Sequence, residues 1–169
     1  DVELVTAAAQ QGAFAGLEWQ VNAVNAPRVA EERGIDVRES KTRQSEDFQS
    51  LVTVTVGAGE DSVSVCGTQF AGDEPRIVRI DQFRVEAVPY GHMLVARNRD
   101  VPGVIGFIGT VLGNHDVNIS GMFNGRETIG GEALSVYTLD DPVGEDVLAE
   151  LEGDDRILET NYIALDNGV

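Results

Sequence analysis

The order of elements in the second half of the chain is set by one stretch, Arg97-Asn-Arg-Asp-Val-Pro-Gly-Val-Ile-Gly106. It follows the apolar run Met93 to Ala96, which predicts a strand. Pro102 suits the first turn of a helix, where its missing N–H costs nothing, and Gly103 lets the backbone turn sharply. We expect the helix to end at Gly113, because apolar residues recur at helical spacing up to that point. These residues are Val104, Ile108, Val111 and Leu112.

Four further segments follow that helix. Their patterns predict strands at 117–123, 133–139 and 157–164, and a helix at 144–152. The dipeptide Asn124-Gly125 predicts a turn, in a connection that Gly130-Gly131 lengthens. From residue 90 to residue 169 the order is therefore βαββαβ, which is the ferredoxin-like arrangement.

Residues 1–89 have a different order, with helices before strands. An alanine-rich helix is predicted from Glu3 to Leu17, and a second helix is predicted with Asn25 as its cap, Pro27 in its first turn and Gly34 as its stop. Alternating β-branched residues then predict an antiparallel meander with strands at 51–56, 62–68, 77–80 and 83–88. We therefore expect an α+β protein, with an antiparallel α/β domain (1–89) followed by a ferredoxin-like domain (90–169).

The charge balance excludes some classes of partner. The chain carries 29 acidic and 12 basic side chains, a formal net charge of −17, and Lys41 is its one lysine. Such a field repels nucleic acids and anionic membranes, so neither is expected as a partner. An acid excess of this kind suits a protein kept in concentrated salt, where repulsion between its own charges is screened, and we take a salt-loving source as a hypothesis.

No apolar run is long enough to span a membrane, and no secretion signal is recognised, so a soluble cytoplasmic protein is expected. The sequence also lacks the common glycine-rich nucleotide loops, the nucleophile-elbow motif and the paired-cysteine or histidine patterns of metal sites. We therefore expect no catalytic residue, no metal and no cofactor in this chain. The lone Cys66 is predicted to pack within a strand.

The residues after the first strand of the second half suit a zwitterion. The N–H groups in the first turn of the predicted helix attract a carboxylate, and Pro102 and Gly103 allow it to approach. Asp100 offers a negative charge to an ammonium group, and Asn118 carries an amide that both donates and accepts. The pattern matches the two ends of an α-amino acid, although from spacing alone ordinary capping and turn chemistry is the preferred explanation of the same residues.

Two sets of residues resemble one family. The 97–106 stretch, followed by Leu112-Gly113 and Val117-Asn118-Ile119, is similar to the ACT domain of D-3-phosphoglycerate dehydrogenases. The earlier segments resemble the intervening domain of the long form of that enzyme. These segments are Val24-Asn25-Ala-Pro27, Ala30-Glu-Glu-Arg-Gly34, Gly67-Thr68 and Arg76-Ile77-Val78.

The resemblance implies more than the residues do. The family oxidises 3-phosphoglycerate with NAD at the start of serine synthesis, and serine inhibits it. Because the chain begins at Asp1, we expect an excised regulatory fragment, with NAD bound in the missing part and some of the intervening domain upstream. By motif position Asn98, Asp100 and Asn118 would hold serine, with Pro102 and Gly103 at the carboxylate. ACT modules pair across a two-fold axis, which implies a homodimer or homotetramer with the effector at the interface.

The intervening domain of the family can also hold an anion. Arg76 matches a basic position of the family, whereas a second basic position is Glu86 here, and Arg79 or Arg84 would have to substitute for it. Surface arginines that balance an acidic face are the alternative interpretation. Two other functions remain open, namely the regulatory or β part of an iron–sulfur L-serine dehydratase and a stand-alone ACT amino-acid sensor.

Overall fold

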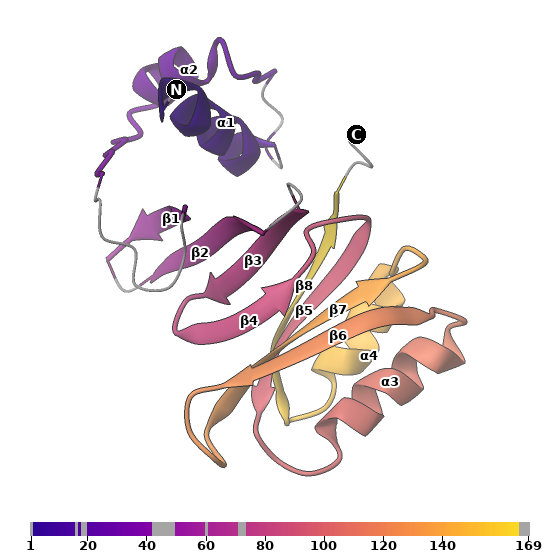
Figure 1. The fold of residues 1–169 in the computed structure, drawn as a ribbon. Helices are drawn as coiled ribbons and strands as arrows, with labels where there is room; N and C mark the ends of the chain where they lie inside the picture. The colour runs from indigo at the N-terminus through magenta and orange to yellow at the C-terminus, as the bar shows by residue number, and fades with distance from the viewer. Residues whose placement is uncertain are drawn as a thin grey trace.

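The computed structural model describes residues 2–15, 17, 20–41, 50–59, 61–70 and 74–165. These residues form an α+β fold with two antiparallel sheets, as predicted (Figure 1). The helices are α1 (Val2–Phe14), α2 (Ala26–Glu32), α3 (Val104–Asn114) and α4 (Glu145–Glu152). The strands of the first sheet are β1 (Val52–Ala58), β2 (Asp61–Phe70), β3 (Glu74–Ile80) and β4 (Phe83–Ala87). Those of the second are β5 (His92–Arg99), β6 (Ile119–Arg126), β7 (Glu132–Leu139) and β8 (Ile157–Ala164).

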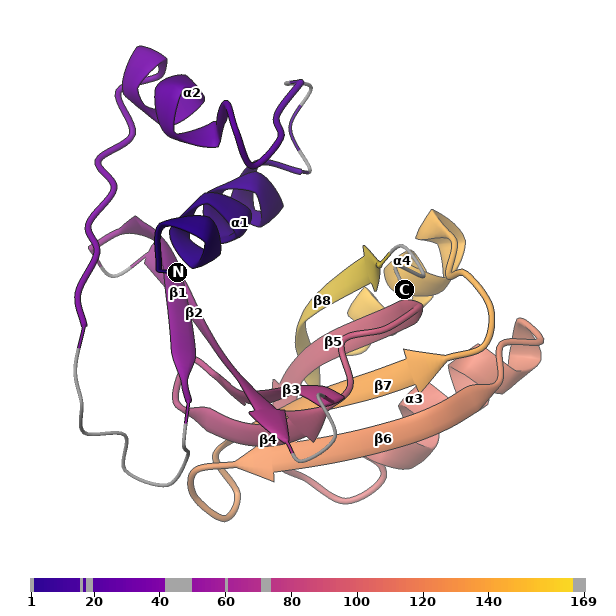
Figure 2. The same cartoon turned by 45° about the horizontal axis from the view of Figure 1, so that its top comes forward.

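The second half has the predicted ferredoxin-like order. Its strands lie in the order β6-β7-β5-β8, so β6 and β8 are the edges of the sheet. Helices α3 and α4 cover one face, as Figure 2 shows. The core beneath them is apolar and includes Leu94, Ala96, Ile108, Leu112 and Leu151. Alternate residues of β5 therefore face the helices, as period-2 patterning requires.

Two local predictions in this half are wrong. Asn124 and Gly125 do not form a turn but continue β6, opposite Ser135 and Leu134 of β7. The reversal comes later, at residues 127–131. Likewise α3 does not end at Gly113. It continues to Asn114, and Asp116 takes the left-handed backbone conformation, with φ 58°.

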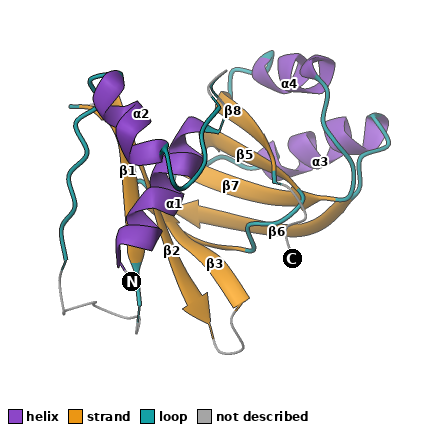
Figure 3. Cartoon of the chain, turned by 90° about the horizontal axis from the view of Figure 1, so that it is seen from above, coloured by secondary structure: helices purple, strands orange, loops and turns teal. Residues whose placement is uncertain are grey.

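The first half forms the predicted meander, with strand order β1-β2-β3-β4. A tight turn at Asp81-Gln82 joins β3 to β4, and Asp81 Oδ1 accepts a hydrogen bond from the Ser64 N–H at 2.8 Å. Helices α1 and α2 pack on each other, away from α3 and α4 (Figure 3). Asn25 precedes α2, but its side chain does not cap that helix. Its Oδ1 accepts from the Asn22 N–H instead.

The two sheets share a second apolar core. Phe83 and Val85 of β4 pack with Met93 of β5 and Val136 of β7, on the face of the second sheet that the helices leave open. Gly125 lies at this contact, because a Cβ atom there would overlap the backbone carbonyl oxygen of Arg84. The meander is thus packed directly against the ferredoxin-like sheet.

Candidate functional site

The loop between β5 and α3 turns at Gly103, which has φ +91°. This conformation is open to glycine and strained for other residues, which explains why the sequence has glycine there. The Gly103 carbonyl accepts the Phe107 N–H at 2.8 Å and closes the first turn of α3. The preceding N–H groups of this turn are those that could bind an anion.

Arg156 stands beside this helix start, and the sequence analysis did not single it out. Its Nη1 atom lies 3.5 Å from the point where a Cβ of Gly103 would be, and its guanidinium stacks over Phe107 at 5.3 Å. Two hydrogen bonds from Arg156, at 2.7 and 2.6 Å, hold Asp154 and lower its pKa to about 2. The structure therefore places a guanidinium that is paired with Asp154 beside the start of α3.

Asp100 faces the turn between β6 and β7 rather than open solvent. Its Oδ2 atom accepts hydrogen bonds from the Gly130 N–H and from Arg126 Nη1, each at 3.0 Å. These two bonds, the Gly130 bond foremost, lower the pKa of the Asp100 carboxyl below its usual value. The carboxylate predicted to receive an ammonium group is thus already paired within the chain.

Asn98 lies near the end of β5 and is only 3% exposed. Its amide donates to the Arg99 carbonyl at 2.8 Å, and its Oδ1 accepts from Ser135 Oγ at 3.3 Å. The same hydroxyl lies 2.8 Å from Asn124 Oδ1, so a polar row crosses three strands. Tyr137, two residues further along β7 than Ser135, is also buried, and its burial raises the pKa of its hydroxyl.

Asn118 is not brought to the other predicted site residues within one chain. Strand pairing aligns Arg126, Ala133 and Asn98 at one end of the sheet, and Ile119, Leu139 and His92 at the other. Asn118 precedes Ile119, so the length of β6, roughly 25 Å, separates it from Asp100. There its amide donates to Asp140 Oδ2 at 2.6 Å.

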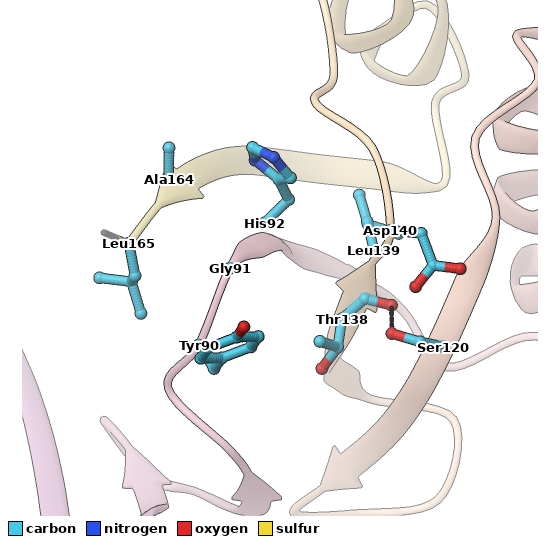
Figure 4. A pocket seen from close by; sticks show the side chains of 9 residues that line it. All are labelled: Tyr90, Gly91, His92, Ser120, Thr138, Leu139, Asp140, Ala164 and Leu165. Atoms are coloured by element: carbon cyan, nitrogen blue, oxygen red, sulfur yellow. Dashed lines mark hydrogen bonds between the residues drawn. The ribbon is translucent and has the colours of Figure 1, made fainter. Parts of the chain in front are cut away.

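A shallow pocket of about 470 Å³ opens at the Asn118 end of the sheet (Figure 4). Its wall carries hydroxyl, imidazole and carboxylate groups together with apolar surface. The lining residues are Tyr90, Gly91, His92, Ser120, Thr138, Leu139, Asp140, Ala164 and Leu165. Asp140 therefore belongs both to this pocket and to the hydrogen bond with Asn118.

The three arginines considered for an anion share one face of the meander. Arg79 of β3 lies directly opposite Arg84 of β4, and Arg76 occupies the next position of the same face beyond a β-bulge. Arg76 pairs with Glu74 at 2.8 Å, while Arg79 donates two hydrogen bonds to the sulfur of the buried Cys66. Cys66 is buried within β2, as predicted.

Two classes of feature are absent from the described part of the chain. No group of three or more His, Cys, Asp or Glu side chains in it is placed to hold a metal ion. None of its helices is both long and apolar enough to cross a bilayer.

Comparisons with known proteins agree over nearly the whole chain. Residues 1–81 match the family described as the D-3-phosphoglycerate dehydrogenase intervening domain. A D-3-phosphoglycerate dehydrogenase from Archaeoglobus fulgidus is 39% identical over 168 residues, which cover 98% of this chain and 32% of that protein. Proteins of the same name from Synechocystis and Bacillus subtilis are 36% and 33% identical, over 88% and 86% of the chain. The chain spans only 27 to 32% of the length of these relatives.

Proposed function

Since this chain belongs to the D-3-phosphoglycerate dehydrogenase family, we propose that it is the regulatory and oligomerisation region of such an enzyme and binds L-serine. Residues 1–89 would be an intervening domain and residues 90–169 an ACT domain. The longer protein would oxidise 3-phosphoglycerate with NAD. The described sheets are antiparallel and lack the parallel βαβ unit on which dinucleotides bind, so they do not fit NAD.

The observation that carries the serine proposal is the position of Asp100 and Asn118 at the two ends of β6, an edge of its sheet. When two such edges pair across a two-fold axis, the strands run antiparallel, and the start of one meets the end of the other. Asn118 of one chain then lies beside Asp100 of its partner. Met122, in the middle of β6 and 41% exposed, would be covered by this pairing.

Each end of the interface would bind one amino acid. The carboxylate would lie at the start of α3 near Arg156, and the ammonium group at Asp100. The partner's copy of Asn118 would supply an amide to a ligand hydroxyl, while Asn98 holds the loop from inside the sheet. Such a ligand favours one mutual orientation of the chains, an effect typically worth about 1–3 kcal/mol.

Calorimetry with L-serine tests this assignment. We expect saturable heat with the wild-type chain and at least tenfold weaker binding by Asp100→Ala, because a charge-assisted contact is lost. Glu159→Ala is the matched control, since it removes an exposed carboxylate from β8, the edge of the sheet opposite β6, and should bind normally. If millimolar serine releases no heat, the proposal is wrong.

A second candidate, an anion site on the meander, is favoured by the pairing of Arg79 with Arg84. Like charges directly opposite each other on neighbouring strands repel, and an anion between them would relieve that repulsion. We expect inorganic phosphate to shift the amide resonances of β3 and β4 in the wild type but not in Arg79→Gln. Shifts that persist in Arg79→Gln would contradict a site built on this residue.

A further inference from the structure

Three hydrogen bonds tie the β5–α3 loop to the turn between β6 and β7. The Asp100 N–H donates to the Gly131 carbonyl at 2.8 Å. In return, Asp100 Oδ2 accepts from the Gly130 N–H and from Arg126, both at 3.0 Å. The two backbone contacts fix where Asp100 lies, and Arg126 supplies the opposite charge.

The two side chains of this ion pair differ in accessibility. The Asp100 side chain is 18% exposed, whereas that of Arg126 is 50% exposed. Arg126 is the last residue of β6, an edge strand of the sheet. In the single chain the guanidinium can therefore leave Asp100 more readily than the carboxylate can move, because the turn holds the carboxylate in place. Asp100 is thus a fixed acceptor whose present cation is replaceable.

We infer that Arg126 competes with the ammonium group of the bound amino acid for Asp100 and so sets the affinity of the effector site. This inference rests on the proposed function, which places that ammonium group at Asp100. A tethered guanidinium is present at constant local concentration, so a ligand must displace it or share the carboxylate with it. The ligand thereby releases Arg126, which lies beside Gly125, the residue packed against the meander.

Two ligands that differ only in the ammonium group can show whether Arg126 competes with that group or attracts the ligand carboxylate. L-Glycerate has a hydroxyl where L-serine has its ammonium group, and otherwise keeps the carboxylate and the second hydroxyl. A neutral hydroxyl makes a weaker hydrogen bond to a carboxylate than an ammonium group does, so competition for Asp100 should affect serine far more than glycerate. If Arg126 instead attracted the carboxylate, it would favour both ligands.

The test is calorimetric titration of the whole chain and its Arg126→Gln variant with L-serine and L-glycerate. We expect Arg126→Gln to bind L-serine about two- to fivefold more tightly, the range that an exposed ion pair supports, and L-glycerate with a clearly smaller change. Arg126→Lys keeps a cation at this position and should stay near the wild type. Arg97→Gln is the matched control, because Arg97 pairs with Glu132 at 2.7 Å in the same sheet and should leave serine affinity unaltered.

Different results would overturn different claims. Equal or weaker serine binding by Arg126→Gln, with serine still bound by the wild type, overturns the competition and leaves the proposed function standing. Equal tightening toward serine and glycerate also overturns it, because the effect would then not depend on the ammonium group. Absence of serine binding by the wild type and by every variant refutes the proposed function itself.

Discussion

His115 stands where α3 ends and faces two carboxylates of α4. Its Nε2 atom lies 2.8 Å from Glu150 and its Nδ1 atom 3.5 Å from Asp146. The hydrogen bond to Glu150, followed by the charges of Asp146, Glu150 and Asp116, raises the pKa of His115 above 6.5. The end of a helix also favours a positive charge.

This environment predicts a pH-dependent contribution to stability. Because the folded pKa is raised, the contribution is complete below the unfolded value near 6.5 and is lost as pH rises through the folded pKa. Urea unfolding should therefore show the largest difference between wild type and His115→Gln below about pH 6, and a difference that shrinks as the pH rises through the folded pKa. Glu150→Gln should remove most of this pH dependence. A difference that grows with pH would be contrary to the assignment.

At single residues, local chemistry could be predicted but long-range contacts could not. Gly103 and Pro102 were identified because backbone conformation and helix entry depend on neighbours in sequence. Arg126 and Arg156 were missed, since only the sheet topology brings them to the β5–α3 loop. An excess of acids with isolated arginines gives no local signal of which arginine meets which acid.

At the scale of elements, β6 shows how tertiary contacts override a turn signal. Asn-Gly is a strong hairpin dipeptide, yet here Asn124 of β6 pairs with Ser135 of the neighbouring strand β7. Glycine is required at position 125 because β4 approaches the backbone closely there. Periodicity predicts α3, α4 and the strands from β3 to β8, because each of them places one face in an apolar core. Periodicity shows that an element has an apolar face but not which element covers that face. The packing of the meander on the open face of the second sheet therefore could not be predicted from the sequence.

The contact at Gly125 predicts a specific loss of stability. A methyl group there overlaps the Arg84 carbonyl, so Gly125→Ala should cost about 1–3 kcal/mol in urea unfolding, as overpacking usually does. Gly106→Ala is the control, because a Cβ at Gly106 on the outside of α3 meets nothing within 4 Å. It should be neutral or stabilise by up to about 1 kcal/mol. Comparable losses of unfolding free energy in both variants would show that the contact between Gly125 and the Arg84 carbonyl does not limit the size of the side chain there.

At the scale of the whole molecule, repulsion among acidic side chains opposes folding. The net charge is −17, and screening shortens the Debye length from about 30 Å at 0.01 M salt to about 3 Å at 1 M. The urea midpoint should therefore rise between dilute and molar potassium chloride, most steeply at the dilute end. Sucrose at equal osmolality is the control for effects other than charge. A midpoint that is flat or falls with salt would remove the case for adaptation to salt.

The proposed serine site is shared by two chains, and complementation between two variants tests this arrangement most directly. Asp100→Ala and Asn118→Ala each spoil every site in their own dimers. When they are mixed and allowed to exchange subunits, a heterodimer keeps Asp100 from one chain opposite Asn118 from the other, so it has one intact site. We predict that calorimetry of the equimolar mixture recovers about a quarter of the wild-type serine sites, at wild-type affinity, because random pairing makes half of the dimers mixed. A mixture that binds no more serine than the separate variants, although each variant forms dimers, would contradict a site built between chains.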